Sequence, residues 1–231
     1  MNNEVKKIVK LVAVNSITFI RLIGSLLLPF IYIKYGPIVV ASFIIIIFLT
    51  DAVDGYLARK LKVATFFGSI IDGSSDKLLN VISFVILGIE YNFMLAPLII
   101  EIAILYTMYS TYRYGGNVQS SKIGKVKTII LDVLVVVSFI VIALPTLNIN
   151  ILANYTEKII NIFSLIILLA CLITLYDYLK KNKKARENPN CIAIKHTKRK
   201  KKSFNLIKKQ LFDTKYYEKH KDESILKQFY I

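Results

Sequence analysis

The sequence predicts an all-α, polytopic membrane protein built as a bundle of six transmembrane helices, and three observations lead to this prediction. The 231-residue chain is 55% hydrophobic, and its mean hydropathy of +0.55 is too high for an ordinary soluble domain. Runs such as IIIIFL and LVVVSFIVIAL leave no polar face for water, which argues against a soluble all-helical protein. Apolar stretches of spanning length, roughly 20 residues, recur at about residues 17–33, 37–58, 68–89, 93–112, 128–145 and 158–179.

The segment before the first span has the pattern of a helix that lies in the headgroup layer. Its apolar and basic residues occupy opposite sides at helical spacing: Val5, Ile8, Val9 and Val12 against Lys6, Lys7 and Lys10. A merely charged flank is the alternative. We therefore expect an N-terminal interfacial helix ahead of the bundle.

The distribution of basic residues between the loops predicts the orientation in the membrane. With the N-terminus inside, the cytoplasmic segments carry most of the Lys and Arg residues, whereas the outer loops hold only Lys34 and Lys158. The positive-inside rule then places both termini on the cytoplasmic side of the cell membrane. The loop that joins the second and third spans lies on the same side.

The last fifty residues differ in composition from the rest of the chain. Residues 180–231 contain 17 of the 31 Lys and Arg residues but only 5 of the 15 acids. We divide the chain into a membrane domain, 1–180, and a basic cytoplasmic tail, 181–231, that is largely disordered apart from one short amphipathic helix over FNLIKKQLF. The run KHTKRKKK favours anionic membrane lipids as a partner, and we expect no specific nucleic acid partner.

Four aspartates lie on either side of the second predicted loop. Asp51 and Asp54 are three residues apart at the inner end of the second span, and Asp72 and Asp76 are four apart at the start of the third. Each helix therefore presents a carboxylate pair on one face. A short loop makes the two helices antiparallel neighbours, so we expect the two pairs to converge at one depth.

Four ionised carboxylates in one place repel one another, so protons or divalent cations must neutralise them. Ligand sets made only of carboxylates favour magnesium, manganese or calcium over zinc, which usually recruits Cys or His. The two histidines, His196 and His220, are distant in the sequence. The pattern indicates a site for hard divalent cations at the membrane edge.

The complete pattern resembles the signature of the CDP-alcohol phosphatidyltransferase family, with every fixed position filled. It reads Asp51-x2-Asp54-Gly55-x2-Ala58-Arg59-x8-Gly68-x3-Asp72-x3-Asp76. The resemblance covers residues 1–180 and is consistent with the six-helix arrangement of that family. It leaves the tail outside.

The resemblance implies an enzyme that transfers a phosphatidyl group from CDP-diacylglycerol to an alcohol and releases CMP. It implies that two Mg2+ or Mn2+ ions are held by Asp51, Asp54, Asp72 and Asp76, and that Asp76 also serves as the general base. The CDP-lipid would be bound by Asp54, Gly55, Ala58, Arg59 and Gly68. The resemblance also implies a homodimer formed through membrane helices.

The acceptor alcohol is indicated by a cationic set on the cytoplasmic side. Arg21, Arg113, Lys125 and Lys127 would bind the phosphate of a phosphorylated acceptor. The run GKVKT, and the first span through Asn15, Thr18, Arg21 and Pro29, resemble bacterial phosphatidylglycerophosphate synthases, which implies glycerol 3-phosphate. Leu131 and Gly73 depart from that pattern, and inositol phosphate is the alternative acceptor.

An ion-coupled transporter is the alternative from another class, because carboxylates inside a bundle also bind sodium or relay protons. Such transporters tend to show internal repeats and broken helices in matching halves. Here the acids concentrate in the second and third spans, which favours the enzyme. Glu101 and Asp132 remain unassigned.

Overall fold

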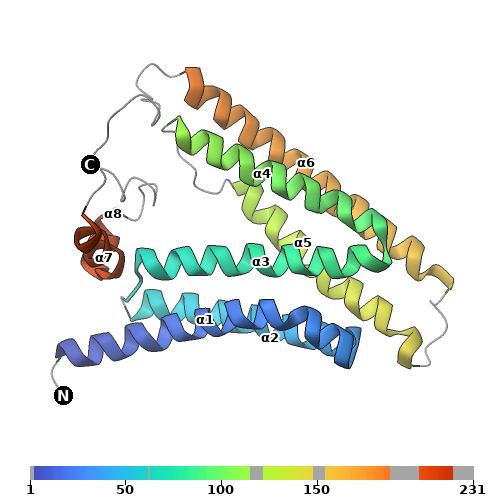
Figure 1. Cartoon of the computed structure of the whole chain (residues 1–231), viewed down its shortest axis with the longest axis horizontal. Coiled ribbons are helices and arrows are strands. Elements are labelled where there is room, and N and C mark those ends of the chain that lie inside the picture. Colours follow the sequence, from blue (N-terminus) through green and yellow to red (C-terminus); the bar gives the residue numbers. More distant parts are fainter. Residues whose placement is uncertain (1–2, 62, 115–121, 148–153, 188–202, 221–231) are drawn as a thin grey trace. The chain divides into compact units, whose positions relative to one another are not determined.

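The computed structural model is built from helices (Figure 1). It describes residues 3–61, 63–114, 122–147, 154–187 and 203–220, and within these ranges it contains no strand. The helices are α1 (Asn3–Tyr35), α2 (Pro37–Lys60), α3 (Phe66–Glu90), α4 (Leu95–Arg113), α5 (Lys122–Ala143), α6 (Thr156–Glu187), α7 (Phe204–Phe212) and α8 (Thr214–His220). Two single-turn 3-10 helices, η1 (Asn92–Met94) and η2 (Pro145–Leu147), precede α4 and follow α5.

Four of the described helices are long and apolar enough to cross a membrane. These candidate spans are Val9–Tyr35, Asn92–Thr111, Ile123–Ala143 and Thr156–Glu187. The two other predicted spans correspond to α2 and α3, which bear the aspartates. The apolar part of α2 is the shorter segment Pro37–Thr50, which ends where Asp51 begins the motif, and α3 carries Asp72, Asp76 and Lys77 in its first half.

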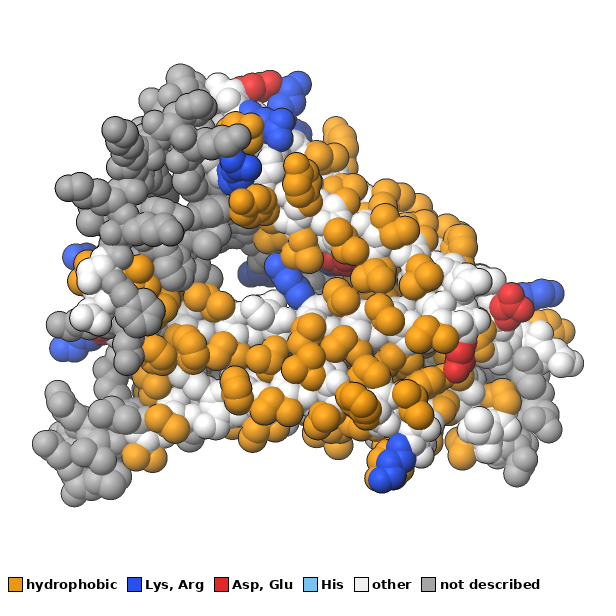
Figure 2. Space-filling view, viewed as in Figure 1, with side chains coloured by type: hydrophobic (Ala, Val, Ile, Leu, Met, Phe, Trp, Pro, Cys, Tyr) orange, Lys and Arg blue, Asp and Glu red, His pale blue; other side chains and the backbone are white. Residues whose placement is uncertain are grey.

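Apolar side chains are exposed along the helices, as expected of surfaces that face lipid rather than water. Phe30, Ile33, Ile89 and Tyr106 are each between 69% and 83% exposed. Figure 2 shows such side chains covering much of the visible helical surface, whereas a water-soluble chain would cover it with polar groups. The chain is a multi-pass membrane protein.

The expected interfacial helix and the first span form one continuous helix, α1. It ends at a tight turn in which Gly36 adopts a φ of +80° and donates its N–H to the Tyr32 carbonyl at 2.9 Å. Only glycine adopts this conformation without strain, and Pro37 then begins α2 at a position where its missing N–H costs nothing. The Gly-Pro pair thus reverses the chain.

The chain divides into two compact units, each with its own packing. The first comprises residues 1–82 and 202–229, and the second comprises residues 83–201 with 230–231. In the first unit α1 and α2 lie side by side (Figure 1). A Cβ added at Gly24 would lie 3.1 Å from the Phe43 ring and 3.7 Å from Ile47, so glycine permits the close approach of these antiparallel helices.

In the second unit α6 packs against both α4 and α5. Ser164 donates to the Phe93 carbonyl at 2.9 Å near one end, and Asn182 donates to the Thr107 carbonyl at 3.1 Å near the other. Because the contacts advance in the same direction along both helices, α4 and α6 run parallel. Their basic C-terminal ends therefore lie at the same end of this unit.

The helix expected over FNLIKKQLF is α7, and a second tail helix, α8, follows it. Asp213 caps α8, with its Oδ1 accepting the N–H groups of Lys215 at 2.8 Å and Tyr216 at 3.3 Å. Helix α6 also continues to Glu187, beyond the boundary expected at residue 180. The other tail residues, 188–202 and 221–231, lie outside the described ranges.

The tail helices pack on the start of α3 within the first unit. The ring of Phe66 lies 5.1 Å from that of Tyr217 and 6.1 Å from that of Tyr216, both edge-on, and Phe67 lies 4.6 Å from Phe212. Phe66 is only 1% exposed as a result. The described part of the tail is therefore attached to the helix that carries Asp72 and Asp76.

Candidate active site

Asp72 and Asp76 lie one turn apart on α3 and face the same side of it. Ser75 lies between them in sequence, is completely buried, and donates to the Asp72 carbonyl at 2.9 Å. The two carboxylate side chains keep 47% and 41% of their surface exposed. Both are therefore accessible to a ligand while their backbone is held in place.

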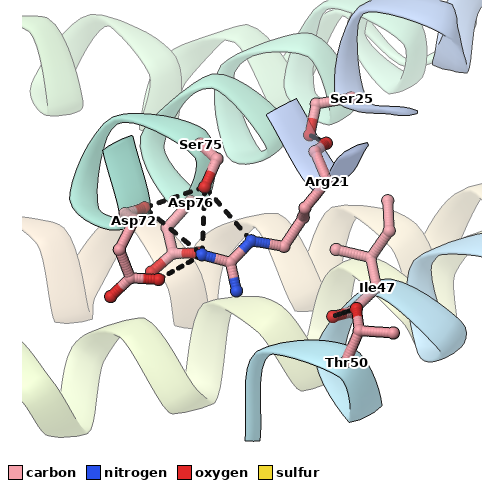
Figure 3. Close-up of polar contacts among 7 residues, drawn as sticks. All are labelled: Arg21, Ser25, Ile47, Thr50, Asp72, Ser75 and Asp76. Carbon is pink, nitrogen blue, oxygen red and sulfur yellow. Dashed lines mark hydrogen bonds and ion pairs between the residues drawn. The ribbon is translucent and has the colours of Figure 1, made fainter. Parts of the chain in front are cut away.

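Arg21 of α1 lies against this pair (Figure 3). Its Nη2 forms a hydrogen-bonded ion pair with Asp72 Oδ1 and lies 3.4 Å from Asp76 Oδ1. Nε and Nη2 also donate to Ser75 Oγ at 3.1 and 3.0 Å. One guanidinium thus contacts three consecutive polar positions of a single helical face.

The burial of Arg21 makes these contacts obligatory. Its side chain is 1% exposed, and a cation removed from water must be paired and hydrogen-bonded. The rigid planar fork of a guanidinium fixes the directions of its contacts to several groups, whereas the freely rotating ammonium of a lysine does not. The same positive charge reduces the repulsion between the two carboxylates.

Gly68 lies one turn before Asp72, where α3 begins. Its N–H donates to Thr65 Oγ1 at 3.1 Å, which caps the helix. A Cβ at this position would lie 2.8 Å from Asn15 Oδ1, closer than real Cβ contacts allow. Glycine therefore lets α1 approach the first turn of α3 next to the aspartates.

The motif residues on α2 are described only in part. The helix continues to Lys60, and the carbonyl of Ala58 accepts the N–H of Val63 at 3.0 Å where the chain leaves it. The side chains of Asp51, Asp54 and Arg59, and the surroundings of Gly55, lie outside the described part of the structure.

The predicted acceptor cations have different surroundings. Arg21 lies on the aspartate pair, as above, and Arg113 at the end of α4 lies over the ring of Tyr109 at 5.9 Å. Lys125 is exposed on the first turn of α5. Lys127 forms an ion pair with Glu101 of α4, in which the two side chains are 12% and 15% exposed.

Two features of these clusters were not anticipated from the sequence. No sequence motif singles out Ser75. Its position three residues after Asp72 nevertheless puts it on the same helical face. An acid in an apolar span, such as Glu101, predicts a nearby cation, and in the structure that cation is Lys127. Cys171 of α6 completes this second cluster with its Sγ 3.5 Å from Glu101 Oε1.

The donor chemistry of the first cluster fits a hard divalent cation. Asp72 and Asp76 supply only carboxylate oxygens and are half exposed, which suits Mg2+ or Mn2+. Among the residues that the structure describes, no three His, Cys, Asp or Glu side chains gather as a metal site. Asp51 and Asp54 are outside that search, so the described pair forms half of the predicted ligand set.

Comparison with known proteins gives a family match over most of the chain. The family model for CDP-alcohol phosphatidyltransferases matches residues 11–176. This range includes the whole aspartate motif, the four helices α2 to α5, and most of α1 and α6. No solved structure matches the chain.

Curated relatives match shorter segments. The CDP-diacylglycerol–glycerol-3-phosphate 3-phosphatidyltransferase of Bacillus subtilis is 37% identical over 95 residues, covering 38% of this chain and 48% of the relative. The Yersinia enterocolitica protein of the same description is 31% identical over 126 residues, covering 48% and 69%. A Schizosaccharomyces pombe cardiolipin synthase (CMP-forming)/mitochondrial hydrolase fusion protein is 37% identical over 65 residues, or 28% of this chain and 11% of the fusion protein. The matches thus span about half of the Bacillus protein and a small part of the fusion protein.

Proposed function

The chain belongs to the CDP-alcohol phosphatidyltransferase family, an enzyme family of phospholipid synthesis, and on that premise we propose glycerol 3-phosphate as its acceptor. The reaction would transfer the phosphatidyl group of CDP-diacylglycerol to glycerol 3-phosphate and give phosphatidylglycerophosphate and CMP. The names of the bacterial relatives support this acceptor. Inositol phosphate is the alternative that the cationic set also fits.

The observation that carries the proposed chemistry is the contact of Arg21 with both Asp72 and Asp76. It holds the third and fourth motif carboxylates in one orientation, half exposed, on one helical face. We assign Arg21 first to this orienting role. If Arg21 also contacts the acceptor phosphate, as the sequence predicts, it must do so while its guanidinium stays bound to Asp72.

The register of α1 and α2 supports convergence of the two aspartate pairs. Gly24 of α1 lies opposite Phe43 and Ile47 of α2. The two helices are antiparallel, so a step toward the N-terminus of α1 matches a step toward the C-terminus of α2. One turn from Gly24 leads to Arg21, and about one turn from Ile47 leads to Thr50 and Asp51. We propose that the turn bearing Asp51 lies at the level of the Arg21 cluster.

We propose that two Mg2+ or Mn2+ ions are held by Asp51, Asp54, Asp72 and Asp76. When bound, they would neutralise the donor pyrophosphate and the charge that develops on the leaving CMP. Gly55 and Ala58 would leave room for the nucleotide, Gly68 would support the CDP-lipid site through the close packing of α1 on α3, and Arg59 would contact the phosphates. The contacts of Arg21 with Asp72, Ser75 and Asp76 support this role, because they orient two of the four proposed ligands.

In the proposed transfer, Asp76 acts as general base. It would accept the proton of the acceptor hydroxyl while that oxygen bonds to the lipid-side phosphorus of the pyrophosphate. The bond from this phosphorus to the oxygen shared with CMP breaks, and CMP leaves with the bonding electrons. The half-exposed position of Asp76 is compatible with an approaching hydroxyl.

For the membrane arrangement we propose six spans, with α2 and α3 added to the four candidate helices. The aspartates would then lie at the cytoplasmic edge together with both termini, as the distribution of basic residues favours. We also propose that the enzyme is a homodimer and that its basic tail binds anionic lipid. The membrane domain and the tail would be separate in function.

A direct assay tests the proposal. Purified full-length protein is mixed with CDP-diacylglycerol and Mg2+, and CMP release is measured with glycerol 3-phosphate, glycerol, inositol phosphate or serine. We expect release with glycerol 3-phosphate and formation of phosphatidylglycerophosphate. Faster release with inositol phosphate would reject the acceptor, and solute uptake without CMP release would favour a transporter.

A further inference from the structure

A cleft between the basic ends of α4 and α6 is not used by the proposed reaction. It has a volume of about 340 Å³, within the range of small-ligand sites. From α4 it is lined by Tyr106, Thr107 and Ser110, and from α6 by Leu179, Asn182, Lys183 and Arg186. Among the described residues, the lining combines hydroxyl and amide groups with two cations and includes no carboxylate.

Arg186 is positioned on the wall of this cleft. Its Nη2 donates to Ser110 Oγ at 3.0 Å, and its guanidinium lies over the ring of Tyr114 at 4.8 Å. A guanidinium has five N–H donors, and this hydrogen bond uses one. Stacking and hydrogen bonding therefore fix a planar fork suited to two oxygens of a phosphate.

The remaining polar groups favour an anion as well. Asn182 joins the two helices through its bond to the Thr107 carbonyl, which keeps the walls together. Lys183 is paired with Glu187 at 3.8 Å, but the two side chains are 77% and 64% exposed. An ion pair this exposed is weak, so Lys183 can turn to a stronger anion.

Apolar stripes lead from the cleft along both helices. On α4 the exposed residues Ile102, Tyr106 and Tyr109 recur at helical spacing, and on α6 Leu172, Tyr176 and Leu179 do the same before Lys183. Both stripes lie within candidate membrane spans, Asn92–Thr111 and Thr156–Glu187, and the cleft lies toward the basic C-terminal ends of the same spans. A ligand with acyl chains would lie along the stripes while its head group met the cations.

We propose that this cleft binds the phosphate head group of an anionic phospholipid, with Arg186 as the main contact and Lys183 as the second. A basic pocket between membrane helices at the headgroup level has the chemistry of such a site. The site differs from a general attraction of the basic tail, because it depends on one positioned guanidinium. It also differs from the acceptor site, because its apolar stripes suit a ligand with acyl chains and the proposed acceptor has none.

The test is a lipid titration of the purified full chain in detergent, followed by native mass spectrometry. We expect phosphatidylglycerol to bind more tightly than phosphatidylcholine, and Arg186→Gln to weaken phosphatidylglycerol binding about tenfold or more, because charge-assisted hydrogen bonds are lost. Lys184→Gln is the matched control, since it removes the same charge from the same helix but does not line the cleft. It should change the affinity less than about twofold, as a screened surface charge does.

Lys183→Gln serves as the second variant, because its exposed side chain can be changed without disturbing the packing. We expect a smaller loss of phosphatidylglycerol binding than for Arg186→Gln. Equal losses in the Lys184 and Arg186 variants would assign the lipid to surface charge and overturn the proposal. Displacement of the lipid by inorganic phosphate or glycerol 3-phosphate at similar concentrations would instead identify a site for a soluble anion, and would also overturn it.

Discussion

Arg21 and Asp72, 51 residues apart in sequence, form an ion pair in which the arginine side chain is 1% exposed and the aspartate 47%. The buried partner cannot exchange its contacts for water, whereas the exposed partner can bind a further ligand on its open side. Arg21 therefore fixes the geometry of an accessible carboxylate.

Replacement of Arg21 should reduce turnover and stability together. Arg21→Ala removes the charge between Asp72 and Asp76, so we expect a loss of about 2 kcal/mol in the free energy of unfolding, less than for a fully buried pair. Arg21→Lys keeps the charge but cannot contact Ser75 and both carboxylates at once. Its thermal stability should recover more than its kcat.

Measurement of kcat and Tm on the same preparations checks this prediction. Lys34→Ala, exposed in the last turn of the same helix, is the control and should leave both unchanged. Full kcat in Arg21→Lys would show that charge alone suffices and that orientation of the aspartates is unimportant.

Removal of divalent cations should abolish CMP release, because the proposed ligand set is made of carboxylates alone. Asp76→Asn should lower kcat by about a hundredfold or more, the contribution typical of a general base, while CDP-lipid binding stays largely intact. Chelator-treated enzyme, with Mg2+ or Mn2+ added back, is assayed beside this variant. Transfer that continues without metal would contradict both the cofactor and the role of the four aspartates.

The sequence was sufficient for the helical class and for the family. Apolar run length predicted each long helix, because a chain in lipid must satisfy its backbone hydrogen bonds internally. It did not predict that α1 continues without a break from Asn3, since the change from amphipathic to apolar composition is no helix terminator. Nor did it predict α8, because TKYYEKH is short and its helix depends on the Asp213 cap and the packing of its tyrosines on Phe66.

The candidate site was predictable in its residues but not in its pairings. Spacing alone put Asp72 and Asp76 on one face of a helix, whereas the choice of Arg21 as their partner depends on how α1 packs on α3. The same limit applies to Lys127, which the sequence grouped with other cations near the cytoplasm. Its ion pair with Glu101 joins α4 to α5 across 26 positions of sequence, and local pattern carries no information about that distance.

The Glu101–Lys127 pair should behave as a buried ion pair in a double-mutant cycle. Glu101→Gln or Lys127→Met alone leaves a largely buried charge without its partner, which typically costs about 3–5 kcal/mol. The double variant removes both charges and should recover much of that loss. Thermal unfolding in detergent measures each corner of the cycle, and strictly additive losses would show that the two residues do not interact.

The aromatic contacts of the tail should stabilise the start of α3. Tyr217→Ala removes the ring nearest to Phe66, and we expect a loss of about 1 kcal/mol beyond that of the exposed control Tyr176→Ala. Truncation after Glu187 should lower the free energy of unfolding by at least the same amount, because it uncovers Phe66 and Phe67. The loss should appear as a lower Tm. Hydrogen exchange of the amides at the start of α3 provides the local measurement, and unchanged protection in the truncated chain would contradict the packing.

The choice of acceptor should depend on Arg113 and Lys125 rather than on the cations that form ion pairs with acids. Arg113 and Lys125 lie at the ends of their helices, whereas Lys127 is held by Glu101, so Arg113→Ala or Lys125→Ala should raise the KM for glycerol 3-phosphate about tenfold or more. The KM for CDP-diacylglycerol should change little, because the aspartate site is intact. Lys158→Ala, near the start of α6 and far from its basic C-terminal end, is the matched control. Glycerol, which lacks the phosphate, should be a poor acceptor for every variant. If glycerol and glycerol 3-phosphate are used equally well, the cations do not bind an acceptor phosphate, and the metal-dependent transferase must use another alcohol.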